Sequence, residues 1–156
     1  MDVGNALKAH DVFRSFPPKQ VDAITAFSSV KTLDKGEIVY GTDKRATHVF
    51  VLLEGKVHLC LPGAPAQPGL VVSRLQKGEL FGVAPLLGCE RYTTRAVCAT
   101  TSKILYIEAQ PLLEMLKSNA FIGQDIMNSV ARGYFERYQR LVDRVQKVVA
   151  DLAPDA

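Results

Sequence analysis

The sequence predicts a mainly β domain with flanking helices. From Val30 to Glu108, short β-branched runs are separated by glycine and proline at intervals of roughly ten residues, which is typical of a sandwich or jelly roll. The segments on either side have the apolar spacing of helices. The chain has 156 residues, of which 47% are hydrophobic and 22% are charged, so it is long enough for one globular domain with its own core.

Composition and charge exclude several classes of protein. The formal net charge is +3, and the 19 lysines and arginines are scattered along the chain, which does not indicate nucleic-acid binding. Charged residues interrupt every apolar run near the N-terminus, so we expect neither a signal peptide nor a membrane span. The histidines do not have the spacing of metal ligands. The chain has three cysteines, Cys60, Cys89 and Cys98, and this odd number without a Cys-x-x-Cys motif argues against a disulfide framework and a metal cluster. We therefore expect a cytoplasmic protein without a metal.

Two helices are expected before the β region. Apolar residues keep a rough helical spacing from Val3 to Phe16, and Pro17-Pro18 ends that pattern. Apolar residues then recur every third position after Pro18, which suits the first turn of a second helix that runs up to Ser28-Ser29.

The β region contains six candidate strands. They are Glu37 to Tyr40, His48 to Leu53, Lys56 to Leu61, Leu70 to Leu75, Tyr92 to Ala99 and Ser102 to Glu108. Three prolines and two glycines between Pro62 and Gly69 cannot sustain a ladder of hydrogen bonds, so this segment is expected to be a hairpin tip. Strand alternation favours a solvated His58, while Cys60 and Cys98 are interpreted as small buried thiols.

The chain returns to helix after Glu108. Pro111 suits the first turn of one helix, which Asn119 ends, and a long helix follows from about Phe121 to Leu152. Two series of residues with a spacing of seven run along the long helix: Met127, Tyr134, Leu141, Val148, and Ala131, Tyr138, Val145, Leu152. This repeat indicates a coiled-coil seam, and we expect a homodimer whose interface contains Tyr134, Tyr138, Leu141 and Val145. The alternative is that the helix packs only on its own domain. Charged residues occupy its other faces, among them Arg137, Arg140 and Arg144, and we expect them to be solvated.

The stretch from Gly78 to Leu87 has two interpretations. Its two glycines lie four residues apart and bracket a short apolar run, so backbone N–H groups and a helical turn after Gly82 could approach an anion closely. The simpler alternative is a strand that ends at Phe81, followed by a glycine turn and a packed Leu86-Leu87 pair.

These segments together resemble the cyclic-nucleotide-binding domain. The resemblance rests on Val39-Tyr40-Gly41-Thr42, on Phe50 to Val57, on Gly78-Glu79-Leu80-Phe81-Gly82 and on the long final helix. It implies an eight-stranded double-sheet jelly roll flanked by helices, with the final helix similar to the dimerisation helix of the catabolite activator protein and its relatives. The expected division is a jelly roll with N-terminal helices over 1–120 and a dimerisation helix over 121–153.

In that family a cassette of the form Phe-Gly-Glu-x-Ala-Leu, followed by Pro-Arg-Ala-Ala, holds the ligand. Phe81 and Gly82 match it, whereas Val83 replaces the glutamate that accepts from the ribose. Counting forward places Tyr92, or Thr93 at a spacing one residue longer, where the family has its phosphate-binding arginine. Arg91 and Arg95 are near, and strand alternation points both away from the Tyr92 face unless a bulge intervenes. The ligand-binding residues implied are Phe81, Gly82, Val83, Ala84, Arg91, Tyr92 and Thr93.

The leading hypothesis is a stand-alone homodimeric sensor that signals through its final helix. The effector is either a cyclic nucleotide or another small molecule, and we expect no other cofactor. Val83 and Tyr92 oppose cyclic AMP or cyclic GMP and favour a less polar or differently charged effector. Two alternatives are an effector-free domain for protein assembly and the sensor part of a transcription regulator. Since the sequence ends at Ala156 without a helix-turn-helix, we expect no direct DNA contact. No catalytic constellation is present, so we do not expect an enzyme.

Overall fold

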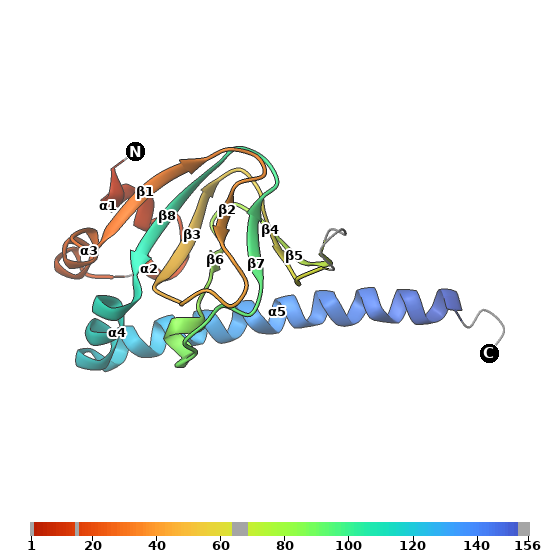
Figure 1. Cartoon of the computed structure of the whole chain (residues 1–156). Coiled ribbons are helices and arrows are strands. Elements are labelled where there is room, and N and C mark those ends of the chain that lie inside the picture. Colours follow the sequence, from red (N-terminus) through yellow and green to blue (C-terminus); the bar gives the residue numbers. More distant parts are fainter. Residues whose placement is uncertain (1, 15, 64–68, 153–156) are drawn as a thin grey trace.

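The protein is a jelly roll of two antiparallel sheets beside a long helix (Figure 1). The structure is a computed structural model that describes residues 2–14, 16–63 and 69–152. The elements in chain order are α1 (Val3–Leu7), α2 (Asp11–Arg14), α3 (Pro18–Thr25), β1 (Ser28–Leu33), β2 (Ile38–Tyr40), β3 (His48–Glu54), β4 (Val57–Cys60), β5 (Val71–Leu75), β6 (Leu80–Phe81), the 3₁₀ helix η1 (Ala84–Leu87), β7 (Arg95–Cys98), β8 (Ser102–Glu108), α4 (Ala109–Ser118) and α5 (Ala120–Leu152). One sheet has the order β1-β8-β3-β6 and the other β2-β7-β4-β5. The expected fold class is confirmed.

Strand β3 separates two hydrophobic cores, because its side chains alternate between two buried faces. Phe50 and Leu52 point between the sheets, into a core that also contains Phe81 and Tyr92. On the opposite face of the strand, the second core joins the sheet to the helices and contains Val49, Val51, Leu53, Leu7, Phe13, Ile24, Leu112 and Ile126. The helices therefore cover one sheet, and the jelly roll keeps its own interior.

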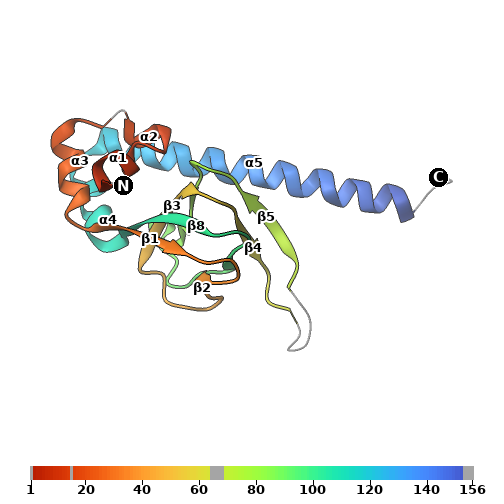
Figure 2. The ribbon, with the colours of Figure 1, turned by 90° about the horizontal axis from the view of Figure 1, so that it is seen from above.

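Helix α5 belongs to the core only in its first part. Ile122, Ile126 and Val130 are buried, whereas the C-terminal end of the helix projects past the strands (Figures 1 and 2). Figure 2 shows the helix passing β5 before it extends beyond the sheets. None of the helices in the described ranges is long and apolar enough to cross a bilayer. The division at residue 120 stays a prediction, and residue 153 lies outside the described residues.

Three arginines attach the middle of α5 to the jelly roll. Arg137 donates from Nη2 to the carbonyl oxygen of Leu80 at 2.6 Å, and Arg144 donates from Nη2 to the carbonyl oxygen of Val71 at 3.1 Å. Arg140 forms an ion pair of 3.6 Å with Glu79. The expectation that these arginines are solvated is wrong for Arg137 and Arg144, because their guanidinium groups donate to carbonyl oxygens of the strands.

The six candidate strands are present, four of them shorter than expected, and β7 is shortened most. Strand β7 begins at Arg95 instead of Tyr92, because the backbone of Tyr92 exchanges hydrogen bonds with the loop at Asp43 and Lys44. Strand β1 was missed, since its serines, lysine and threonine hide the apolar alternation of an edge strand that pairs with β8. The hairpin tip predicted between Pro62 and Gly69 lies largely outside the described residues, at 64–68.

The single helix expected over Val3 to Phe16 is a wrong prediction. The structure has α1 and α2 instead, with Lys8 closing the first helix. The ring Nδ1 of His10 accepts a hydrogen bond of 3.2 Å from the backbone N–H of Val12, as a side-chain cap does at the start of a new helix.

Candidate functional site

A cavity of about 260 Å³ lies between the jelly roll and α5. Its jelly-roll side is contributed by β2, β4, β5, the turn after β6 and the segment before β7, and its remaining side by α5. The lining residues are Tyr40, Leu59, Val72, Ser73, Gly82, Val83, Ala84, Tyr92, Thr93, Thr94, Tyr134, Arg137, Tyr138 and Leu141. The lining is mainly apolar and aromatic, with hydroxyl groups and one guanidinium group.

Gly82 forms the turn between β6 and η1 and has a φ of +63°. A Cβ atom at this position would lie 2.5 Å from Cδ2 of Phe50 and 3.0 Å from Cε2 of Tyr40. Side chains are disfavoured at this φ, and a methyl group would also collide with the ring of Phe50. The glycine therefore permits the chain to cross the aromatic core. A strand that ends at Phe81 and a glycine turn were the simpler interpretation of this stretch, and both are present. The packed pair of leucines is present only in part, because Leu86 is buried but Leu87 is 46% exposed.

Tyr92 is buried inside the jelly roll, with 4% of its surface exposed. Its ring stacks on Tyr40 with the ring centroids 4.0 Å apart. Its hydroxyl donates a 2.6 Å hydrogen bond to the carbonyl oxygen of His48 and accepts one of 3.2 Å from the N–H of the same residue. Burial raises the pKa of the Tyr92 hydroxyl, so the group is a neutral donor at ordinary pH. The ring of Tyr92 lines the cavity while its hydroxyl is engaged with backbone.

Arg137 brings a positive charge to the α5 side of the cavity. Burial raises the pKa of Tyr40 strongly, while the Arg137 guanidinium and a hydrogen bond with the Thr94 side chain oppose that rise. Burial also raises the pKa of Tyr134, again with Arg137 opposing the rise. Arg137 therefore acts electrostatically on two of the tyrosines that line the cavity.

The structure brings five of the seven predicted ligand-binding residues to this cavity. Gly82, Val83, Ala84, Tyr92 and Thr93 line it. Phe81 lies behind Phe50 in the core between the sheets, with the two ring centroids 5.3 Å apart. Arg91 is exposed and donates from Nη1 to the carbonyl oxygen of Asp43 at 2.6 Å, and it does not belong to the described lining.

Other lining residues escaped the sequence analysis. Tyr40 stands in the Val39-Tyr40-Gly41-Thr42 segment on which the resemblance rested, and strand alternation could have pointed it inward. Arg137 gave no such signal, because its position depends on how α5 lies on the sheets. Tyr134, Tyr138 and Leu141 were expected at a dimer interface, and all three also line the cavity.

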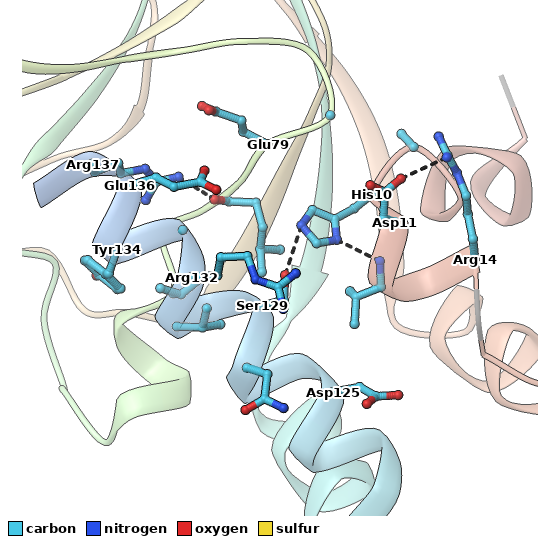
Figure 3. A pocket seen from close by; sticks show the side chains of 18 of the residues that line it. His10, Asp11, Arg14, Glu79, Asp125, Ser129, Arg132, Tyr134, Glu136 and Arg137 are labelled. Atoms are coloured by element: carbon cyan, nitrogen blue, oxygen red, sulfur yellow. Dashed lines mark hydrogen bonds and ion pairs between the residues drawn. The ribbon is translucent and has the colours of Figure 1, made fainter. Parts of the chain in front are cut away.

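A second, larger cleft of about 730 Å³ lies between α2, the β5–β6 turn and α5, and Figure 3 shows it from close by. The ring Nε2 of His10 lies 3.3 Å from the hydroxyl of Ser129 across this cleft. Its walls carry both signs of charge, for example Asp11, Arg14, Glu79, Asp125, Arg132 and Glu136 (Figure 3). The cleft shares Val83, Tyr134 and Arg137 with the smaller cavity, so the two spaces adjoin along α5.

The described part of the chain holds no group of three or more metal-ligating side chains. Cys60 and Cys98 are buried free thiols, as expected, and Cys89 is an exposed free thiol.

The chain is similar to cyclic nucleotide-binding proteins in both sequence and structure. The family model described as "Cyclic nucleotide-binding domain" matches residues 30–119. A candidate cyclic nucleotide-binding protein from Geobacter metallireducens has 27% identity and a TM-score of 0.76, with 88% of this chain and 99% of that chain covered. The sensor domain of the transcriptional regulator DNR from Pseudomonas aeruginosa has 18% identity and a TM-score of 0.70, with 83% of this chain and 91% of that chain covered.

A second candidate cyclic nucleotide-binding protein, from Ruegeria pomeroyi, has 23% identity and a TM-score of 0.67. The match covers 94% of this chain and 62% of that chain, so that relative has a substantial part without a counterpart here. No curated protein matches the sequence significantly.

Proposed function

The chain belongs to the cyclic nucleotide-binding domain family, and we propose that it is a regulatory sensor whose small effector binds in the cavity between the cassette and α5. The proposed role is regulatory and not catalytic. Three free cysteines fit a reducing compartment, and we place the protein in the cytosol on that ground.

One observation carries the proposal: the cavity is lined both by the cassette turn and by residues of the heptad seam. Gly82, Val83 and Ala84 come from the turn, and Tyr138 and Leu141 come from α5. A molecule in the cavity would therefore contact the same side chains that a second copy would contact. Differential contact of this kind is what a ligand needs in order to shift a conformational or association equilibrium.

The dimer part of the proposal is supported by the exposed apolar face of α5. Tyr134 is 46% exposed, Tyr138 62%, Leu141 38% and Val145 54%, although all four are apolar or aromatic. They keep the sevenfold spacing along a helix whose C-terminal end projects past the strands (Figure 1). A partner helix of the same sequence would cover this seam. We propose that the effector signals by altering how the two helices pack.

The two substituted cassette positions argue against an ordinary cyclic nucleotide. Val83 is 3% exposed and is packed in the core shared with the helices, where a glutamate would be a buried charge. Tyr92 has its hydroxyl bonded to His48, so it offers a ring face in place of a cationic phosphate ligand. Losing both polar contacts would weaken binding by roughly a hundredfold to ten-thousandfold.

The proposal is tested by measuring the thermal unfolding temperature and the sedimentation coefficient with and without a panel of cyclic nucleotides and small aromatic molecules. A ligand at a hundred times its dissociation constant adds about 2.7 kcal/mol, which raises the melting temperature by several degrees. A Thr93→Trp variant, which places a large ring at the cavity, should lose the shift. A Gln110→Trp variant, exposed on α4, should keep it.

A second candidate function is an effector-free domain for protein assembly. It is favoured by Tyr92, which fills the place of the expected arginine and is satisfied by backbone. This alternative predicts no shift with any member of the panel, together with a dimer whose stability the Thr93→Trp variant does not change. A shift that Thr93→Trp abolishes would exclude it.

A further inference from the structure

We propose that the effector is a small flat aromatic acid whose ring lies among the tyrosines of the cavity and whose single carboxylate binds Arg137. This inference rests on the proposed sensor function and names the class of ligand for that same cavity. Three features of the lining carry it: its aromatic rings, its single charge and its size.

The aromatic part follows from four tyrosines that come from two sides. Tyr40 and Tyr92 form a stacked pair on the jelly-roll side, with an interplanar angle of 22°. Tyr134 and Tyr138 line the cavity from α5 and are exposed, at 46% and 62%. Exposed rings that face a stacked pair favour a flat ligand, because aromatic groups prefer offset stacks and edge-to-face contacts.

The acidic part follows from Arg137. Among the described residues that line the cavity, it is the one with a formal charge, and the lining contains no carboxylate to neutralise it. Its contact with the Leu80 carbonyl uses Nη2, whereas a guanidinium group carries five N–H donors. A carboxylate accepts two parallel hydrogen bonds from such a fork, and a cationic ligand would be repelled.

The size of the cavity limits the ligand further. Its volume of about 260 Å³ lies below the roughly 300–1,000 Å³ of pockets that hold drug-sized molecules, so a molecule of one or two rings fits best. The side chains around the turn are Val83 and Ala84, which offer apolar contact and no acceptor for ribose hydroxyl groups. The hydroxyl groups of Ser73, Thr93 and Thr94 line the cavity as well, so a further polar substituent on the ring could form a hydrogen bond there.

The position of Arg137 also connects the ligand to α5. The Leu80 carbonyl that Arg137 binds lies in β6, two residues before Gly82. A carboxylate that accepts from other N–H groups of Arg137 would share the guanidinium group with this carbonyl. Binding would therefore couple the ligand directly to one of the attachments of α5, while Arg144, seven residues further along, keeps its contact with Val71.

Isothermal titration calorimetry with 2-naphthoate and its neutral analogue 2-naphthamide tests the inference. We expect the carboxylate to bind roughly 10- to 100-fold more tightly than the amide, the value of a charge-assisted hydrogen bond. Arg137→Gln should remove this preference and leave the amide unaffected. Arg144→Gln is the matched control, because Arg144 also donates to a strand carbonyl but does not line the cavity, and it should keep the preference. Thermal unfolding without ligand checks the folding of each variant, and Arg137→Lys, with charge but no fork, should show an intermediate preference.

Four results would overturn the inference. Equal affinity for the acid and the amide would show that the effector needs no carboxylate, and it would leave the sensor function unaffected. Tighter binding of cyclic AMP than of 2-naphthoate, unchanged by Arg137→Gln, would return the effector to the cyclic nucleotides. If neither naphthalene compound binds saturably, but another panel member raises the melting temperature and Thr93→Trp abolishes that rise, only the proposed ligand class of aromatic acids is rejected. Absence of every shift would reject the sensor function as well.

Discussion

The hydroxyl group of Tyr92 pairs with both backbone groups of His48, donating to its carbonyl oxygen at 2.6 Å and accepting from its N–H at 3.2 Å. His48 begins β3, the strand that separates the two cores. The residue that follows the cassette therefore fixes the end of a central strand. At the position where the family resemblance places a phosphate-binding arginine, this chain has a residue with a structural role.

Tyr92→Phe is expected to destabilise the domain. The substitution keeps the ring stacked on Tyr40 but leaves the N–H and the carbonyl group of His48 without this partner, at a cost of about 1–3 kcal/mol. Chemical denaturation should show a lower midpoint with an unchanged slope. Tyr138→Phe is the matched control, since Tyr138 is 62% exposed, and should change stability by less than about 0.5 kcal/mol. Equal stability of Tyr92→Phe and the native protein would contradict the structural role.

Gly82→Ala and Gly88→Ala separate backbone strain from crowding. Both glycines have positive φ, +63° and +77°, so alanine costs about 1 kcal/mol or more at either position. At Gly88 the new methyl group meets nothing within 4 Å, whereas at Gly82 it collides with the ring of Phe50. Overpacking adds about 1–3 kcal/mol, so Gly82→Ala should be the more destabilising by that amount in denaturation experiments. Similar losses at the two positions would show that the ring of Phe50 yields easily.

The sequence was sufficient for the class of fold because the glycine and proline punctuation is local. Several turns require backbone angles that favour glycine, as at Gly36, Gly55 and Gly78, which all have positive φ. Strand β1 and the break between α1 and α2 escaped, because both depend on a partner. Strand β1 is polar and is defined by pairing with β8, and the break depends on the side chain of His10.

The candidate site was predictable only on its cassette side. A motif with fixed spacing located Gly82, Val83 and Tyr92, although the engagement of Tyr92 with His48 needed the packed structure. Arg137 was expected to be a solvated helix residue. Its contact with Leu80 joins two residues 57 positions apart and arises only when α5 docks on the sheets. Long-range docking leaves no periodic signal in either segment, so sequence patterns cannot report it.

Val145→Glu is expected to weaken or abolish a dimer. Val145 is 54% exposed, lies on the proposed seam and does not line the cavity, so its replacement should leave the monomer folded. A dimer would bury two copies of the glutamate, and the dissociation constant should rise by roughly a hundredfold or more. Sedimentation velocity over a concentration series measures this change.

Gln146→Glu provides the control for charge, because Gln146 adjoins Val145 in sequence but lies off both sevenfold series. It should leave the dissociation constant within a fewfold of the native value. A native protein that remains monomeric at every concentration would contradict the interface, and so would equal effects of the two substitutions.

The last prediction concerns His10, which joins α2 to α5. Its Nδ1 accepts from the N–H of Val12, so the neutral ring carries its proton on Nε2, which lies 3.3 Å from the hydroxyl of Ser129. Burial lowers the pKa of His10 below its usual 6.5, with Asp11 opposing the shift and Arg14 adding to it. Protonation of Nδ1 would also break the hydrogen bond that His10 accepts from the Val12 N–H.

Stability should therefore fall as the pH drops below about 6.5, because the unfolded chain then binds a proton that the folded chain excludes. The loss should level off below the lowered folded-state pKa, and above neutral pH the group should contribute no pH dependence. His10→Gln should reduce the slope of unfolding free energy against pH between 7.5 and 5.5. Burial also lowers the pKa of His48 and His58, so these histidines should account for part of the remaining slope. If the slope of the variant equals that of the native protein, the pKa of His10 is not lowered in the fold, and the predicted burial of its neutral ring is wrong.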